Sequence, residues 1–284
     1  MWAQSLIASI IFFVGASVGS FLNVVAYRMP LGRSVVSPGS ACPACETPIA
    51  WYDNLPVLSW FILRGRCRHC GAGFSFRYAG VEALFGLYTL AIVIRWDLTV
   101  HSLTCVLAGA VLVAIALIDH DSWLIDDRMS AAVALIGLTG HGASLLVDAE
   151  LGVGATLASV AAHLIAGAVA FGMLYGMGYL MTKALDKEAL GGGDAPLFAA
   201  IVCCTGMSGV LPVLMLASIQ GLIGWAILSR RGGIGNREVE HDDGWQPEEG
   251  ALPLGIFLAL AGLEVMLIGE GLTDLYLETI RSLL

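Results

Sequence analysis

The sequence predicts an all-α, polytopic membrane protein: a bundle of about eight transmembrane helices that carries one small loop domain. Hydrophobic residues make up 57% of the 284 residues and charged residues only 13%, about half the charged share of a soluble domain. The mean hydropathy is +0.82. The apolar residues fall into long runs, and the longest polar segment between them contains two Cys-x-x-Cys pairs.

Eight apolar runs are candidates to cross the hydrocarbon core, for which a helix needs about 20 residues. The first run lacks a basic flank and continues to about Tyr27, too long for a signal-peptide core, so we expect an uncleaved first helix. The short sixth run and the break at Gly209-Val-Leu-Pro212 leave open whether that region forms two helices or one kinked hairpin. The runs are residues 5–27, 79–95, 100–118, 130–147, 154–182, 195–209, 211–229 and 253–270.

The basic residues predict the orientation of these helices. Of the 14 Lys and Arg residues, only Arg95 and Arg281 fall on one side of the eight-helix arrangement. The positive-inside rule therefore places the other side in the cytoplasm and both termini in the periplasm. The loops 28–78, 119–127, 191–194 and 230–252 would all face the cytoplasm. The residues on that side are Arg28, Arg33, Arg64, Arg66, Arg68, Arg77, Arg128, Lys183, Lys187, Arg230, Arg231 and Arg237.

The chain divides into four predicted parts. Residues 1–27 form the first transmembrane helix, and residues 28–78 form a cytoplasmic loop domain. Residues 79–270 form the membrane core. Residues 271–284 form an amphipathic tail on the periplasmic surface, because its apolar residues recur at helical spacing.

The four paired cysteines indicate a metal site in the loop domain. A domain of this size usually needs a cross-link or metal to be stable. Four thiolates at this spacing suit tetrahedral zinc in a closed, structural site, and a reducing cytoplasm argues against disulfides. The arginines around the second pair would offset the excess negative charge. The predicted ligands are Cys42, Cys45, Cys67 and Cys70; Cys105, Cys203 and Cys204 lie in apolar runs, where thiols behave as small hydrophobic groups.

A cluster of carboxylates follows the third apolar run. Ionisable groups at the membrane boundary are costly, so they are functional candidates. Asp119 directly follows the apolar stretch 111–118 and is expected to point into the bundle. Asp121, Asp126 and Asp127 have easier access to water, and they are also compatible with simple solvation of the interface.

The stretch Gly191-Gly192-Gly193-Asp194 places a second carboxylate directly before another apolar run. Three glycines leave the backbone unshielded and free to adopt positive φ, so an extended substrate can approach Asp194 closely. The alternative is a flexible linker whose aspartate caps a helix that starts at Ala195.

If Asp119 and Asp194 meet at the cytoplasmic mouth of the bundle, they would share one proton. One carboxylate would act as a base on water while the other polarises a peptide carbonyl. The same pair is also compatible with an ion-coupled transporter. A third possibility is a catalytically silent assembly factor built on the zinc loop.

Two further acidic features allow a functional and a structural interpretation. Glu82 lies in an apolar run, where it either pairs with a neighbouring polar or backbone group or helps shape the site. The loop 230–252 carries six acids, which form either a solvated loop or a surface that attracts a basic substrate segment. The lipid bilayer is the expected environment, no nucleic-acid partner is expected, and the sequence does not fix the oligomeric state.

Several motifs, in order along nearly the whole chain, resemble those of the type IV prepilin peptidases, which are membrane aspartic peptidases of the Gly-x-Gly-Asp type with N-methyltransferase activity. The matching segments are Gly19 to Arg28, Cys42-Pro-Ala-Cys45, Asn54 to Trp60, Arg64 to Arg68, Arg77 to Glu82, Ile118-Asp119 with Asp127, Gly191 to Asp194, and Pro253-Leu-Gly255. Four positions depart from the family pattern: Pro196 replaces a lysine, Asp126 a proline, and Leu254 and Ile256 a phenylalanine and a proline.

The resemblance implies that Asp119 and Asp194 are the catalytic pair, supported by Gly191, Gly193 and Asp127, and that the four paired cysteines bind zinc. It also implies cleavage of a short basic leader after a glycine, at the cytoplasmic face, from type IV pilins or secretion-system pseudopilins. The new N-terminus would then be methylated with S-adenosylmethionine (SAM). Loss of the lysine removes a positive charge near the pair, for which Arg128, Lys183 or Lys187 would compensate.

Overall fold

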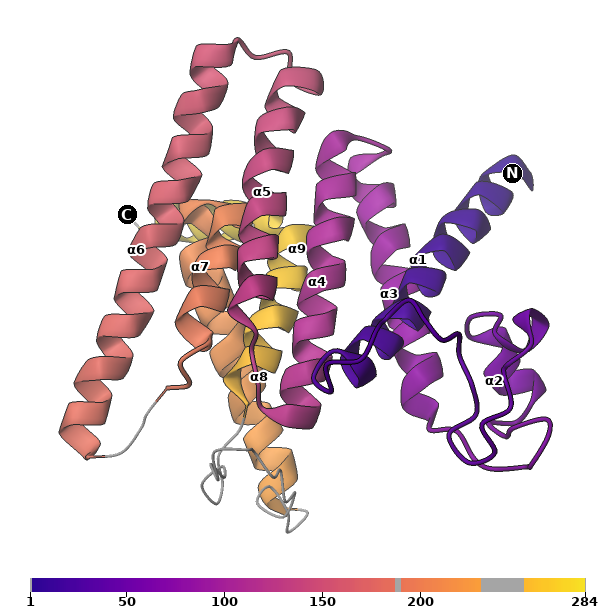
Figure 1. Ribbon diagram of the computed structural model, residues 1–284. Coiled ribbons are helices and arrows are strands. Elements are labelled where there is room, and N and C mark those ends of the chain that lie inside the picture. The colour runs from indigo at the N-terminus through magenta and orange to yellow at the C-terminus, as the bar shows by residue number, and fades with distance from the viewer. Residues whose placement is uncertain (1, 187–189, 231–252, 284) are drawn as a thin grey trace. The chain divides into compact units, whose positions relative to one another are not determined.

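The computed structural model describes residues 2–186, 190–230 and 253–283 (Figure 1). These residues form helices and loops, with two isolated β-bridges, Ala41–Pro48 and Arg66–Gly73, in place of strands. Six of the helices in these ranges are long and apolar enough to cross a membrane, and two further apolar helices are shorter. The predicted all-α membrane fold is confirmed, and the count of eight helices is approximate.

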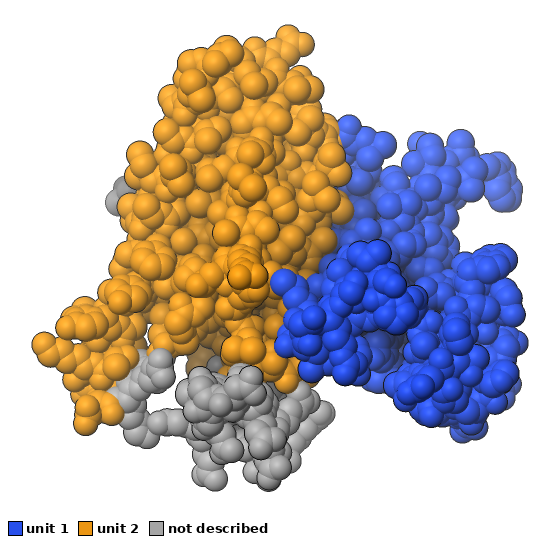
Figure 2. Space-filling model, in the orientation of Figure 1, with its two compact units in different colours: residues 1–98 blue, residues 99–284 orange. Residues whose placement is uncertain are grey.

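The chain forms two compact units, residues 1–98 and 99–284 (Figure 2). In the first unit, α1 (Trp2–Arg28) packs along α3 (Phe76–Trp96), and the loop between them contains η1 (Trp51–Asp53) and α2 (Leu58–Ile62). Glycines allow the two long helices to approach closely. A Cβ on Gly86 of α3 would lie 2.9 Å from the carbonyl oxygen of Phe12 in α1.

The second unit contains the remaining helices. The bounds of α4 to α9 lie close to the predicted apolar runs, except that α9 continues through residues 271–283, the predicted tail. Whether that segment lies on the periplasmic surface stays a prediction. The elements are α4 (Val100–Ser122), α5 (Asp127–Val147), α6 (Val153–Leu185), α7 (Asp194–Thr205), η2 (Met207–Gly209), α8 (Val210–Arg230) and α9 (Leu254–Leu283).

Local sequence signals explain where α4 and α5 begin and end. The Thr99 hydroxyl accepts a hydrogen bond from the Ser102 N–H and the Ser102 hydroxyl accepts one from the Thr99 N–H, which forms a capping box for α4. The helix ends at Ser122, and its C-cap residue Trp123 has a φ of +56°. Asp126 then caps α5 by accepting a hydrogen bond from the Arg128 N–H at 2.8 Å.

Two helices, rather than one kinked hairpin, follow the glycine triplet. The chain turns at Gly206, which has a φ of +70°, a value that favours glycine. This position lies three residues before the break that the sequence suggested at Gly209. Pro212 is in the first turn of α8, where its missing N–H costs no helical hydrogen bond.

Helix α7 forms the core of the second unit and packs against α5, α6 and α9 (Figure 1). Eight of its 12 residues are buried. At about 1.5 Å per residue it is roughly 18 Å long, which is well short of the roughly 30 Å hydrocarbon core. It is therefore a central packing helix that is too short to cross the bilayer alone.

Small residues on its neighbours let α7 pack closely. A Cβ on Gly137 of α5 would lie 2.9 Å from the Cα atom of Cys204, and a Cβ on Gly167 of α6 would lie 3.1 Å from the carbonyl oxygen of Ala199. Membrane helices associate largely through close packing at such positions. The adjacent Cys203 and Cys204 thus occupy space that neighbouring glycines leave free.

We predict that Gly137→Ala lowers the stability of the protein, because the new methyl group overlaps the α7 backbone and overpacking costs about 1–3 kcal/mol. Gly172→Ala in α6 is the matched control, since its Cβ meets no atom within 4 Å and alanine favours a helix over glycine by up to about 1 kcal/mol. Thermal unfolding in detergent measures both effects. A Gly137→Ala midpoint at or above that of the Gly172→Ala protein would contradict this packing.

Candidate functional site

Asp119 lies in the last turn of α4 and is only 3% exposed. Its Oδ2 atom accepts a hydrogen bond from the backbone N–H of Ile256, at 2.9 Å, in the first turn of α9. The N–H groups in the first turn of a helix have no partners within the helix, and they favour negative charge. Gly255 leaves room for this contact, because a Cβ there would lie 2.6 Å from Asp119 Oδ2.

Asp194 is the first residue of α7 and is 5% exposed. Its Oδ2 atom accepts a hydrogen bond from the Gly191 N–H at 3.0 Å, so its side chain folds back onto the glycine triplet and does not cap the following helix. The expectation about glycine conformation was wrong: Gly191, Gly192 and Gly193 all lack a positive φ. Gly193 is needed for close approach instead, since its Cβ would lie 2.6 Å from the Cβ of Ile125.

The structure brings the two aspartates together at one end of the second unit, where α4 ends and α7 and α9 begin (Figure 1). Their carboxyl groups lie close enough to interact electrostatically. The Ile125 side chain fits against both backbone segments, because Cβ atoms on Gly193 and Gly255 would each lie within 2.6 Å of it. This apolar contact holds both carboxyl-bearing segments in place.

The other acids of the cluster are not part of this arrangement. Asp121 is exposed and contacts His120 Nδ1 at 2.9 Å. Asp126 caps α5. Asp127, the first residue of α5, is exposed. All six acids of the 230–252 loop lie outside the described residues, so the predicted attraction of a basic segment stays a prediction.

The lysine that the resemblance leads us to expect is replaced by Pro196, in the first turn of α7. Of the cations considered as substitutes, Lys187 lies outside the described residues. Within the described part of the chain, neither Arg128 nor Lys183 forms an ion pair with Asp119 or Asp194. Among the described residues, the pair is therefore held by backbone N–H groups, with no ion pair to a lysine or arginine.

The four paired cysteines converge in the first unit. The sulfur atoms of Cys42, Cys45, Cys67 and Cys70 all lie within 4.8 Å of one another, and they are free thiols. The Cys42 and Cys70 sulfurs are 3.8 Å apart. This matches the edge of a tetrahedron with Zn–S bonds of about 2.3 Å, so the donor set and its geometry fit a zinc ion.

Both cysteine pairs lie on the same type of turn. In each turn the first cysteine donates from its backbone N–H to a carbonyl five residues ahead, Cys42 to Thr47 and Cys67 to Ala72. The residue after the second cysteine has a positive φ, +56° at Glu46 and +75° at Gly71. Two equivalent turns facing one another place four sulfurs around one point.

The arginines near this cluster are not all available to offset thiolate charge, as the sequence suggested. Arg68 forms a bidentate ion pair with Asp53, at 2.7 Å and 2.5 Å. Its guanidinium lowers the pKa of the Asp53 carboxyl below the ordinary value. This pair connects the second cysteine turn to η1.

Glu82 of α3 pairs with a backbone group of the loop. Its Oε2 atom accepts a hydrogen bond from the Val57 N–H at 2.6 Å. Val57 has a φ of +64°, a strained conformation for a β-branched residue. Glu82 therefore belongs to the first unit, in agreement with the expected pairing to a backbone group.

Two members of the aspartate site have no chemical signature in the sequence. Ile256 contributes only a backbone N–H, and Ile125 contributes apolar contact. The Pro253-Leu-Gly255 segment was the available signal, because a glycine just inside a helix start indicates close backbone approach.

Comparison with known proteins identifies the family. A model of the bacterial peptidase A24 N-terminal domain matches residues 13–96, and a model of the type IV leader peptidase family matches residues 105–226. A prepilin leader peptidase/N-methyltransferase of Myxococcus xanthus is 32% identical over 94% of this chain and 92% of that protein. A protein of the same name from Aeromonas salmonicida is 33% identical over 96% and 94%, respectively.

A type 4 prepilin-like proteins leader peptide-processing enzyme of Escherichia coli O78:H11 is 35% identical over 77% of this chain and 84% of that protein. No solved structure matches the chain. The two family matches together with these full-length similarities show that this chain belongs to the type IV leader peptidase family of enzymes.

Proposed function

We propose that this protein is a membrane aspartic endopeptidase that removes the leader peptide of type IV prepilins or pseudopilins after a glycine. The observation that carries the proposal is the approach of two buried carboxyl groups, Asp119 and Asp194, from positions far apart in the chain. The names of the relatives support the substrate class. The peptidase family match favours an enzyme over an ion-coupled transporter or a catalytically silent assembly factor.

The mechanism follows from how each carboxyl group is held. Each has one oxygen bonded to a backbone N–H, which leaves its other oxygen for water and substrate. Two carboxylates this close cannot both ionise cheaply, so the pair shares a proton and titrates as a unit. The ionised member takes a proton from the attacking water. The protonated member polarises the scissile carbonyl and later protonates the leaving amine.

The glycine triplet gives an extended peptide access to Asp194. A Cβ on Gly192 would meet no atom within 4 Å, so this backbone borders open space. We propose that the leader–pilin junction lies along this segment.

We propose further that the site faces the cytoplasm with both termini in the periplasm, as the distribution of basic residues indicates. The new N-terminus is then methylated with SAM, a step that the N-methyltransferase names of the relatives support. The four-cysteine cluster holds a structural zinc ion, since four thiolates leave no open coordination position.

Asp119→Asn and Asp194→Asn should each slow leader cleavage by about 10²–10⁴-fold, the usual contribution of general acid–base catalysis. The double variant should be little slower than the worse single variant, because the two groups act as a unit. Cleavage of a purified prepilin by the purified enzyme measures this. Asparagine keeps the shape and an acceptor oxygen, so the thermal midpoint should not fall.

Asp121→Asn is the matched control, because Asp121 is exposed on the same helix. It should cleave at the wild-type rate. Normal processing by either Asp119→Asn or Asp194→Asn would exclude the shared-proton mechanism.

Cys45→Ser should reduce the bound zinc measured by elemental analysis of the purified protein and lower its thermal midpoint, because zinc binding contributes to folding of small domains. Cys105→Ala removes a buried thiol of α4 outside the cluster and should retain the metal. Equal zinc content in both variants would argue against the four-cysteine site.

Mass analysis of the processed pilin N-terminus should show cleavage after glycine and one added methyl group when SAM is supplied. Without SAM, the same cut should appear without the methyl group. A cut at another residue would contradict the proposed specificity, and a correct cut that is never methylated would limit the enzyme to peptidase activity.

A further inference from the structure

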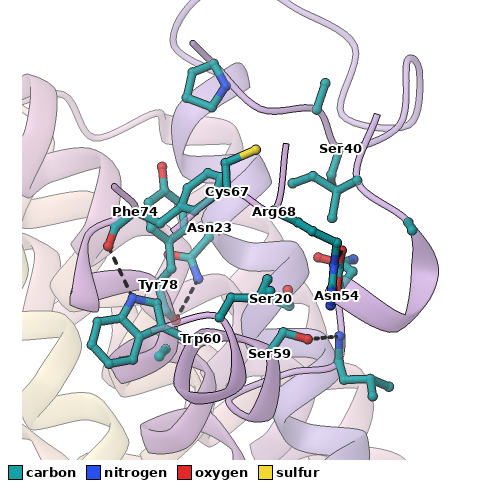
Figure 3. Close-up of a pocket in the computed structure, with 18 of the residues that line it drawn as sticks. Ser20, Asn23, Ser40, Asn54, Ser59, Trp60, Cys67, Arg68, Phe74 and Tyr78 are labelled. Atoms are coloured by element: carbon teal, nitrogen blue, oxygen red, sulfur yellow. Dashed lines mark hydrogen bonds and ion pairs between the residues drawn. The ribbon is translucent and has the colours of Figure 1, made fainter. Parts of the chain in front are cut away.

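The first unit contains a half-open cavity of about 590 Å³ between α1, the cysteine-containing loop and α3 (Figure 3). This volume lies within the range of about 300–1,000 Å³ that is typical of small-molecule sites. The residues of the aspartate pair do not line it. The peptidase mechanism therefore leaves its purpose unexplained.

Aromatic rings form much of the cavity wall. Trp60 is held in place by a hydrogen bond from its Nε1–H to the carbonyl oxygen of Phe74, at 3.2 Å (Figure 3). Its ring also packs edge-on against Phe76. Flat rings at fixed positions provide stacking surfaces for a planar ligand group and favour cations near their faces. The rings that line the cavity are Tyr27, Tyr52, Trp60, Phe74 and Tyr78.

Charges of both signs line the same cavity. Asp53 is neutralised by its ion pair with Arg68. The Glu82 carboxylate accepts the Val57 N–H and has no ion pair within the described residues. Arg28 donates to the carbonyl oxygens of Ser34, Pro38 and Gly39, and it too lacks a carboxylate partner in that part of the chain. Arg66 also lines the wall without a carboxylate partner among the described residues, so the cavity presents one uncompensated anion and two uncompensated cations.

Asn23 supplies an unsatisfied polar group in the wall. It is 3% exposed, and its Nδ2 donates to the carbonyl oxygens of Gly19 and Tyr78, each at 3.3 Å. Its Oδ1 atom has no hydrogen-bond partner among the described residues. An unpaired buried acceptor is destabilising, and a ligand that donates to it would remove that cost.

Strain in the backbone also lies beside this cavity. Val57 has a positive φ and follows closely after Asn54 and Leu55, which line the cavity wall. Glu82 holds this conformation through the Val57 N–H. Strained residues that the surrounding structure maintains cluster at ligand sites.

We propose that this cavity binds SAM, an inference that rests on the methyl-transfer step of the proposed function. Aromatic rings suit the adenine, Glu82 suits the positive sulfonium or ammonium group, and Arg28 suits the carboxylate. A basic leader segment would instead meet three arginines in the wall, at 28, 66 and 68. When bound, SAM supplies the methyl group: the free amine bonds to the methyl carbon, the carbon–sulfur electron pair stays on sulfur, and the new ammonium releases a proton.

The test measures equilibrium binding of SAM to the purified full-length protein by calorimetry, with prepilin cleavage followed in parallel. Ser20→Phe places a ring into the cavity from α1. Ser20 makes no hydrogen bond through its side chain in the described structure. The Ser20→Phe substitution should weaken SAM binding by about tenfold or more. Ser17→Phe, one turn earlier on an exposed face of the same helix, should bind SAM as the wild-type protein does.

A second variant keeps the cavity open. Glu82→Gln retains an acceptor for the Val57 N–H but removes the negative charge. It should weaken binding of SAM, whose sulfur is positively charged, more than binding of S-adenosylhomocysteine, whose sulfur is neutral. An equal loss for both ligands would remove Glu82 from sulfonium recognition and contradict that part of the assignment.

The outcomes separate this inference from the proposed function. A wild-type protein that cleaves prepilin but does not bind SAM would overturn the cavity assignment and leave the peptidase proposal intact. The assignment also fails if Ser20→Phe keeps its zinc content and thermal midpoint yet binds SAM normally. The assignment fails equally if Ser20→Phe abolishes the binding of a leader-derived basic peptide but leaves the binding of SAM unchanged.

Discussion

The hydrogen bond from the Ile256 N–H to the Asp119 carboxyl is the interaction on which the second unit depends. A carboxyl group buried at the end of an apolar helix is costly unless polar groups satisfy it. The chain meets this requirement with unpaired N–H groups at the starts of other segments, Ile256 for Asp119 and Gly191 for Asp194. Close approach of these segments requires glycine at 193 and 255. Charge burial thus dictates the local backbone arrangement.

In the first unit, the same loop segments contribute to the four-cysteine cluster and to the cavity wall. Cys67 contributes both a sulfur to the cluster and a surface to the cavity wall. The Arg68–Asp53 ion pair and the Glu82–Val57 hydrogen bond fix this loop against η1 and α3. A loop of this length has no large apolar core, so the four-cysteine cluster and a few polar contacts determine the shape of the cavity.

The sequence predicts features that depend on composition and regular spacing. Long apolar runs predicted the helices to within a few residues, apart from the C-terminal end of α9. The two Cys-x-x-Cys pairs predicted the cluster because thiol chemistry is visible in residue type. Features that depend on backbone groups or on one-to-one pairing were not predictable. Ile256 acts through a backbone N–H, a group that every non-proline residue has. Arg68 forms its ion pair with Asp53 and not with the thiolates. The glycine triplet allows close packing without adopting positive φ.

The dependence of Asp119 on Ile256 has a consequence for biosynthesis. The two residues are separated by 137 positions, and Ile256 belongs to the last helix of the chain. A nascent polypeptide still on the ribosome can insert the helices that carry both aspartates well before α9 emerges. It then lacks the donor that orients the first of them. If Asp119 is catalytic, as proposed, proteolytic competence would arise only after α9 has been synthesised and packed, which spares neighbouring nascent proteins from cleavage by an incomplete site.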